Sequence, residues 1–250
     1  EITYGDWSSD VCSSDLDYWI VKTDSLGIKQ WDKRYGGTGD DRIYSLEQTT
    51  DQGYILGGFS SSPISGDKTQ ANWDTSASYP GDYWIVKVDS LGNKEWDKRF
   101  GGFHEEDLRY IHQTPDKGYI MGGLTFSDSS GDISQPSRGS YDYWILKIDS
   151  IGNNEWDKRY GGSGSENYFG NILSTSDNGY LICGSSYSPM SADKSENNLG
   201  FMQTWIVKID SIGNKEWDKT IFTNGNSYEE GYVLQDDKGC YVLANCTNGG

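Results

Sequence analysis

The chain has few of the residues that build metal centres, redox pairs or nucleophile–base catalytic sites. Its 250 residues include only two histidines, four cysteines and five prolines. Cys183, Cys240 and Cys246 show no C-x-x-C spacing, so neither a zinc site nor a redox dithiol is indicated. We interpret these three as small, buried structural residues. No apolar run approaches the roughly 20 residues of a membrane-spanning helix, so membrane insertion is not expected.

Positive charge is also scarce. The sequence carries 21 lysines and arginines against 38 aspartates and glutamates, a formal net charge of -17. Polyanions repel such a surface, so nucleic acid and anionic membranes are excluded as expected partners.

The first 16 residues differ from the rest. The segment Asp6 to Leu16, which contains Cys12, resembles one translated reading frame of a sequencing-library adapter. We therefore interpret residues 1–16 as a non-native leader and 17–250 as the protein proper. The chain then reads as a metagenomic fragment of a longer, multidomain protein, whose signal peptide and sorting domain would lie outside it.

One sequence motif occurs four times, in copies that start near residues 17, 82, 142 and 203. Each copy holds two tryptophans twelve residues apart: Trp19 and Trp31, Trp84 and Trp96, Trp144 and Trp156, and Trp205 and Trp217. A period of roughly 60 residues indicates a repeat architecture. Because the spacing inside the motif does not vary, we expect these eight tryptophans to be structural and largely buried.

Each period contains four short apolar runs separated by turns. In the second copy, Asp82 to Asp89 is rich in β-branched and aromatic residues, and 90–93 is a turn whose glycine can adopt positive φ. Apolar residues on both faces of such a run predict a sheet that is covered on both sides. The pairs Gly57-Gly58 and Gly122-Gly123 predict places where another backbone comes close. We expect an all-β fold, a β-propeller of four-stranded antiparallel blades.

The tryptophan motif carries a family resemblance. Val-Lys-Val-Asp-x-x-Gly-x-x-x-Trp resembles the tryptophan-docking motif of quinoprotein-like propellers. The whole period, with its Gly-Gly pair and Asp-x-Gly-Tyr-Ile-x-Gly-Gly, is more closely similar to the delta-60-type propeller repeats of secreted Bacteroidota-type surface proteins. The resemblance covers nearly all of 17–250 and implies an extracellular or cell-surface location. Its motif residues are structural, so it implies no particular reaction.

The blade phase stays open. In the quinoprotein-like phase the tryptophan hairpin forms the two outer strands, and the runs near Leu108 and Tyr119 form the inner two. Residues 17–37 and 228–247 would then be two half-blades that could close a four-bladed ring. We favour an arc of a larger propeller, because families of this kind imply rings of more than four blades.

A lysine recurs inside the first apolar run, and an aspartate follows the second tryptophan of every copy. We expect the lysines to pair with these aspartates across the hairpin or to pack on an indole face, and both roles are structural. The lysines are Lys22, Lys87, Lys147 and Lys208, and the aspartates are Asp32, Asp97, Asp157 and Asp218.

Candidate binding residues lie in the loops. Asp67, Asp132 and Asp193 recur in three related segments, where a turn bonded to its own backbone is favoured over a calcium site. An acidic residue follows each glycine pair, at Asp41, Glu106 and Glu166, and we expect it to accept loop amides rather than to catalyse. His104 and Glu105 belong to a solvated loop. Trp73 and Asp74 offer an exposed indole beside a carboxylate, a platform for sugar or protein.

The favoured function is non-enzymatic: a secreted or surface-anchored propeller that binds a glycan or protein on its loop face. No catalytic, metal or cofactor-binding residue is assigned. The alternatives are a quinoprotein-like oxidoreductase and a purely structural spacer of a larger surface protein.

Overall fold

The computed structural model describes residues 15–74, 81–221 and 231–246, and these contain strands, turns and loops but no helix. Positions 6–14 of the adapter-like segment, Cys12 included, lie outside the described residues. No helix in the described part is long and apolar enough to cross a bilayer. The strands are β1 (Tyr18–Thr23), β2 (Lys29–Tyr35), β3 (Asp41–Gln48), β4 (Tyr54–Ser60), β5 (Asp82–Val88), β6 (Lys94–Phe100), β7 (Glu106–Gln113), β8 (Tyr119–Thr125), β9 (Asp142–Ile148), β10 (Asn154–Tyr160), β11 (Glu166–Ser174), β12 (Tyr180–Ser186), β13 (Gln203–Ile209), β14 (Lys215–Ile221), β15 (Tyr232–Gln235) and β16 (Tyr241–Ala244).

The strands form three complete four-stranded antiparallel sheets, in the orders β3-β4-β5-β6, β7-β8-β9-β10 and β11-β12-β13-β14. β1-β2 and β15-β16 form separate two-stranded sheets. Each complete sheet joins two strands from one copy of the repeat to the tryptophan hairpin of the next. The sheets are propeller-type blades in which β3, β7 and β11 are the inner strands and the tryptophan hairpin forms the outer pair.

Both faces of the middle strands are covered, as the unbroken apolar runs predict. All seven residues of β5, β9 and β13 are buried. The buried side chains form clusters between successive blades; one joins Tyr83 and Ile85 of β5 to Trp144 and Leu146 of β9. Packing between neighbouring blades therefore provides the core, and a single blade has little core of its own.

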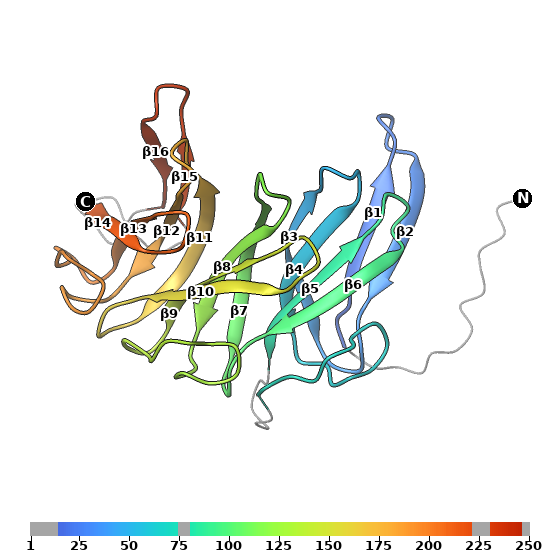
Figure 1. The fold of residues 1–250 in the computed structure, drawn as a ribbon, viewed down its shortest axis with the longest axis horizontal. Coiled ribbons are helices and arrows are strands. Elements are labelled where there is room, and N and C mark those ends of the chain that lie inside the picture. The colour runs from blue at the N-terminus through green and yellow to red at the C-terminus, as the bar shows by residue number, and fades with distance from the viewer. Residues whose placement is uncertain (1–14, 75–80, 222–230, 247–250) are drawn as a thin grey trace, which may run out of the picture.

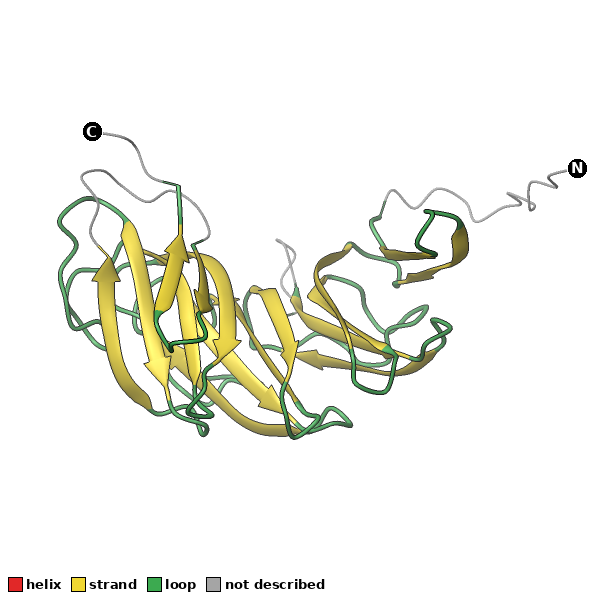
Figure 2. Ribbon diagram, turned by 90° about the horizontal axis from the view of Figure 1, so that it is seen from above, coloured by secondary structure: helices red, strands yellow, loops and turns green. Residues whose placement is uncertain are grey.

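The blades follow one another along an open arc, with β1-β2 at one end and β15-β16 at the other (Figures 1 and 2). In the described ranges these half-blades do not pair, so the four-bladed closure is not formed. Sequence gives a reason. A Cβ on Gly118 would lie 2.4 Å from the carbonyl oxygen of Ile148 in the outer hairpin. Cys240 occupies the same place before β16, so an outer hairpin docked in the usual register would collide with its side chain.

The predicted glycine pairs do lie where neighbours come close. A Cβ on Gly123 would stand 2.1 Å from the carbonyl oxygen of Asp107 on the adjacent strand, which confirms the backbone approach. Gly122 faces the next blade instead, and a Cβ there would lie 2.4 Å from the Phe169 ring. Gly123 therefore allows close approach of the adjacent strand within the sheet, and Gly122 allows close packing of the next blade.

The hairpin turns clasp one blade to the next. Gly92 has φ +76°, as its turn requires, and a Cβ on it would lie 2.8 Å from Lys33 Cγ in the preceding hairpin. Tyr35 of that hairpin donates its hydroxyl hydrogen to the Gly92 carbonyl oxygen at 2.6 Å. Tyr160 repeats this bond to Gly213.

Burial divides the eight repeat tryptophans into three groups. Trp84, Trp144 and Trp205 are fully buried, as expected, and the second tryptophan of each pair is half-buried. Trp19 contradicts the expectation, because 59% of its surface is exposed. Trp84 is covered by Tyr18, Ile20 and Tyr35 of the preceding hairpin, whereas in the described residues no hairpin packs on the corresponding face of β1.

The cysteine expectation is only partly correct. Cys183 is buried in β12, where its low-dielectric surroundings raise the pKa of the thiol to about 12. Cys240 and Cys246 are exposed, one in the turn before β16 and the other beyond its end. The final strand, β16, runs only from Tyr241 to Ala244 and therefore includes neither cysteine.

Candidate functional site: the loop face

Two sets of loops converge at one end of the blades, and we call this end the loop face. The Gly-Gly loops lead into β3, β7 and β11, and the variable loops follow β4, β8 and β12. Because these strands are antiparallel neighbours, the start of one lies beside the end of the other. The variable loops after β4 and β8 lie along the lower side in Figure 1.

The recurring aspartates tie the variable loops to the Gly-Gly loops. Asp132 accepts the Gly101 amide through Oδ2 at 3.1 Å, and its own amide donates to the Gly101 carbonyl at 2.8 Å. Asp67 and Asp193 repeat both bonds with Gly36 and Gly161. Each segment is a turn, as expected, but its carboxylate bonds across to the neighbouring loop instead of to its own backbone. That expectation is corrected.

The acidic residues after the glycine pairs accept loop amides, as predicted. Glu106 Oε2 accepts the Gly102 amide at 2.7 Å, and Oε1 accepts the Thr125 hydroxyl at 2.7 Å. Asp41 and Glu166 accept the corresponding amides of Gly37 and Gly162. Burial raises the pKa of Glu106 to about 8 and that of Glu166 to about 7.

A second buried carboxyl faces two of these acids, Glu106 and Glu166. Asp82 Oδ1 and Glu106 Oε2 both lie within 3 Å of the position a Gly101 Cβ would take, so only glycine fits there. Asp82 Oδ1 has no hydrogen-bond partner, and burial raises the pKa of Asp82 to about 7. Asp142 and Glu166 repeat the pair beside Gly161. The negative charge of the neighbouring aspartate adds to burial in raising the pKa of each glutamate, from Asp82 on Glu106 and from Asp142 on Glu166.

The recurring lysines have partners that the sequence did not indicate. Lys147 Nζ forms ion pairs with Asp116 Oδ2 at 2.9 Å and Glu155 Oε2 at 2.8 Å. Lys87 and Lys208 repeat both pairs, so the expected pairing with the aspartate after the second tryptophan is wrong. Lys22 lacks these carboxylates and packs 5.9 Å from the Trp31 ring, the other expected arrangement.

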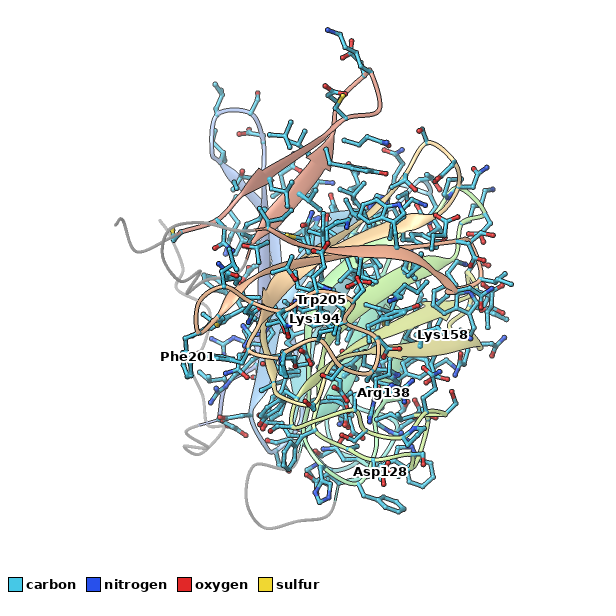
Figure 3. The ribbon with its side chains drawn as sticks, turned by 90° about the vertical axis from the view of Figure 1, so that its left-hand side faces the viewer. Asp128, Arg138, Lys158, Lys194, Phe201 and Trp205 are labelled. Carbon is cyan, nitrogen blue, oxygen red and sulfur yellow. The ribbon has the colours of Figure 1, made fainter. Side chains whose placement is uncertain are left out.

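The aspartates after the second tryptophan bind the buried indoles instead. Asp97 Oδ2 accepts the Trp84 indole N–H at 3.1 Å and the Thr69 amide at 2.9 Å. Asp157 and Asp218 do the same in the next two blades. These residues therefore connect the core to the variable loops. In the last complete blade Lys194 also packs over the Trp205 ring at 5.7 Å (Figure 3).

Aromatic and apolar side chains stand exposed on this rigid base. Trp73 is 40% exposed, as expected, with its indole N–H bonded to Asp132 and its ring 6.3 Å from Phe103. Phe103 is 59% exposed, and Phe201 is 69% exposed at the edge of the face (Figure 3). Other exposed apolar side chains in these loops are Ile64, Phe126, Met190 and Leu199.

A cavity of 360 Å³ opens between the inner strands β3 and β7, at the end of these strands that lies on the loop face. Its lining is Asp40, Arg42, Tyr44, Phe59, Ser61, Glu105, Asp107 and Arg109. Arg42 pairs with Asp40 at 2.9 Å, and Arg109 pairs with Asp107 at 2.6 Å. Arg109 also lies 4.5 Å from the centre of the Tyr44 ring.

The expected binding residues separate by burial. Glu106 and Asp74 are buried, so a ligand on the surface does not reach them, and these two assignments are corrected. Glu105 lines the cavity and accepts the Tyr141 hydroxyl at 2.9 Å. His104 is exposed and packs edge-on against Phe126. In the described part of the chain, no group of three or more histidine, cysteine, aspartate or glutamate side chains could hold a metal ion.

Sequence reasoning missed Tyr44 and Arg109, which lie at β-bulges. The register shifts between Ile43 and Ser45 in β3, and between Leu108 and Tyr110 in β7. A bulge inserts a residue and re-aims its side chain. The sequence did contain a sign of these two residues, because the residue at the bulge differs from repeat to repeat. The corresponding bulge in β11 holds Gly170.

No protein-family model and no curated protein matches this chain. A Bacteroides caccae protein of unknown function matches the structure with a TM-score of 0.44 and 8% sequence identity. The match covers 92% of this chain and 65% of the Bacteroides chain. A mutant apocarotenoid oxygenase from Synechocystis matches with a TM-score of 0.40 and 11% sequence identity. That match covers 84% of this chain and 51% of the oxygenase chain. This chain thus spans about two thirds and one half of those proteins.

Proposed function

We propose that this chain is a non-enzymatic binding domain of a delta-60-like, secreted or cell-surface propeller, and that its loop face binds a glycan or protein ligand. The observation that carries the proposal is the exposure of Trp73, Phe103, Phe126 and Phe201 on loops that buried and half-buried carboxyl groups hold in place. Exposed aromatic side chains on a rigid base are typical of recognition surfaces. Immobilised loops also lose little conformational entropy on binding.

Contacts that recur in every blade differ from the exposed side chains that occur only once. The carboxyl pairs, lysine ion pairs and indole bonds repeat from blade to blade, as parts of a scaffold do. The side chains of the cavity and of the exposed aromatic set do not repeat. A unique surface on a repeated frame supports binding of one ligand at one place.

The test is a binding screen of the purified chain on an array of glycans and a panel of extracellular proteins. We expect a ligand whose binding is lost in the double variant Phe103→Ser, Phe126→Ser. Leu26→Ser is the matched control, because Leu26 is also an exposed apolar residue but lies in a hairpin turn at the opposite end of the blades. Binding that survives the double variant would contradict the proposal. Substrate turnover with a bound quinone would favour an oxidoreductase, and no binding at all would favour a spacer.

A further inference from the structure

We infer that the cavity between β3 and β7 is a binding site for one unit of a neutral saccharide. This inference rests on the proposed function and names the ligand chemistry of one part of the loop face. The volume of 360 Å³ falls at the lower end of the range for small-molecule sites, about 300–1,000 Å³. It suits a single small ring system.

The lining alternates hydrogen-bond donors and acceptors. Asp40 pairs with the guanidinium of Arg42, and Asp107 pairs with that of Arg109, so each donor group lies beside an acceptor at the cavity. A guanidinium carries five N–H donors, and a carboxylate has several acceptor sites, so each ion pair retains further capacity. Hydroxyl groups on adjacent sugar carbons both donate and accept, which matches this arrangement.

Charge excludes an acidic ligand. Three carboxylates, from Asp40, Glu105 and Asp107, face two guanidiniums across the cavity. The site therefore has no excess positive charge, and the whole chain is strongly acidic. A uronate or sulfated sugar would be repelled, whereas an uncharged sugar would not be.

The aromatic lining fits the apolar face of a sugar ring. Phe59 forms a nearly buried part of the wall, and Tyr44 is 41% exposed. The cation–π contact with Arg109 restrains the Tyr44 ring. Together these rings supply a surface for C–H groups beside the polar groups that would bind hydroxyls.

The site is particular to this one junction between blades. Tyr44 and Arg109 both come from bulges, and both line the cavity. At the next junction the equivalent bulge residue is Gly170, which supplies no side chain. Two bulges that direct side chains into one cavity are a feature of sites more than of scaffolds.

The experiment is calorimetric titration of the full chain with neutral oligosaccharides of glucose, mannose and galactose, and with oligogalacturonate as the acidic counterpart. We expect one neutral series to bind and the acidic series not to bind. Tyr44→Ala and Arg109→Met should each raise Kd roughly tenfold or more. Ser61→Leu should also block binding, because it fills the cavity without removing a charged or aromatic lining group. Unfolding curves confirm that each variant is folded.

Leu26→Ala is the matched control, since it removes an exposed apolar side chain in the β1–β2 hairpin turn, at the end of the blades opposite the cavity. It should leave Kd for the saccharide unchanged. The inference fails if no neutral saccharide binds, if the acidic series binds better, or if all three cavity variants bind like the parent chain. If another ligand binds and only the Phe103→Ser, Phe126→Ser double variant weakens it, the loop-face function stands and the cavity assignment is overturned.

Discussion

The tryptophan motif offers a matched pair of substitutions, because the same residue of the same motif is buried in one copy and exposed in another. Trp84 is fully buried, lies 4.8 Å from the Tyr18 ring, and donates its indole N–H to Asp97. Trp19 makes the equivalent bond to Asp32 at 3.2 Å but is 59% exposed. Trp84→Ala should therefore destabilise the protein far more than Trp19→Ala.

The expected difference follows from the buried surface. Replacing a core tryptophan with alanine costs about 3–5 kcal/mol through lost burial and the cavity that remains. Asp97 would also lose one of its bonds at a buried position, a further cost of about 1 kcal/mol. Trp19→Ala loses less than half of that burial and a solvent-exposed bond, so about 1 kcal/mol is expected. The two variants should differ by roughly 3–5 kcal/mol, a large part of the 5–15 kcal/mol stability of a typical domain.

Urea unfolding monitored by far-UV circular dichroism measures both variants at several protein concentrations. The reasoning would be refuted if the two substitutions lowered the free energy of unfolding equally. Equal and concentration-dependent losses would mean that β1-β2 is covered in solution by another copy of the chain. Equal losses without concentration dependence would mean that β1-β2 is packed within the chain.

Three further expectations concern pH, backbone and metal. Glu106 has a folded-state pKa of about 8 against an ordinary 4.5, so its stabilising contribution is complete below pH 4.5 and is lost as pH rises through 8. The free energy of unfolding should therefore fall less between pH 5 and 8 in Glu106→Gln than in the parent chain. Equal changes in the free energy of unfolding for the two proteins would contradict this. Gly118→Ala should cost about 2 kcal/mol or more, because the added Cβ meets the Ile148 carbonyl at 2.4 Å; an unchanged urea midpoint would show that the blade adapts. Calcium or a chelator should leave Tm unchanged, because Asp132 and its equivalents already accept loop amides, and a calcium-dependent rise would reverse that assignment.

Local signals in the sequence were enough for the blades. β5 and its equivalents read as apolar on both faces, the turn near Gly92 has the residue that positive φ requires, and the spacing of the tryptophans does not change. Each of these depends on neighbours a few residues away in the chain. The strands, turns, repeat period and all-β class could therefore be predicted. The acceptor role of Glu106 was also predictable, because its partner amide is only four residues distant.

Tertiary structure decided everything that depends on which segments of different repeats meet. Lys147 pairs with Asp116, 31 residues before it, because β8 and β9 lie side by side in one sheet. Trp19 is exposed although its sequence matches Trp84, because burial depends on a preceding hairpin that covers the indole and not on the motif. The cavity arises where two bulges aim Tyr44 and Arg109 toward each other from strands in different blades. Sequence specifies local conformation through nearby contacts, whereas ion pairs, exposure and sites depend on distances that only the folded chain sets.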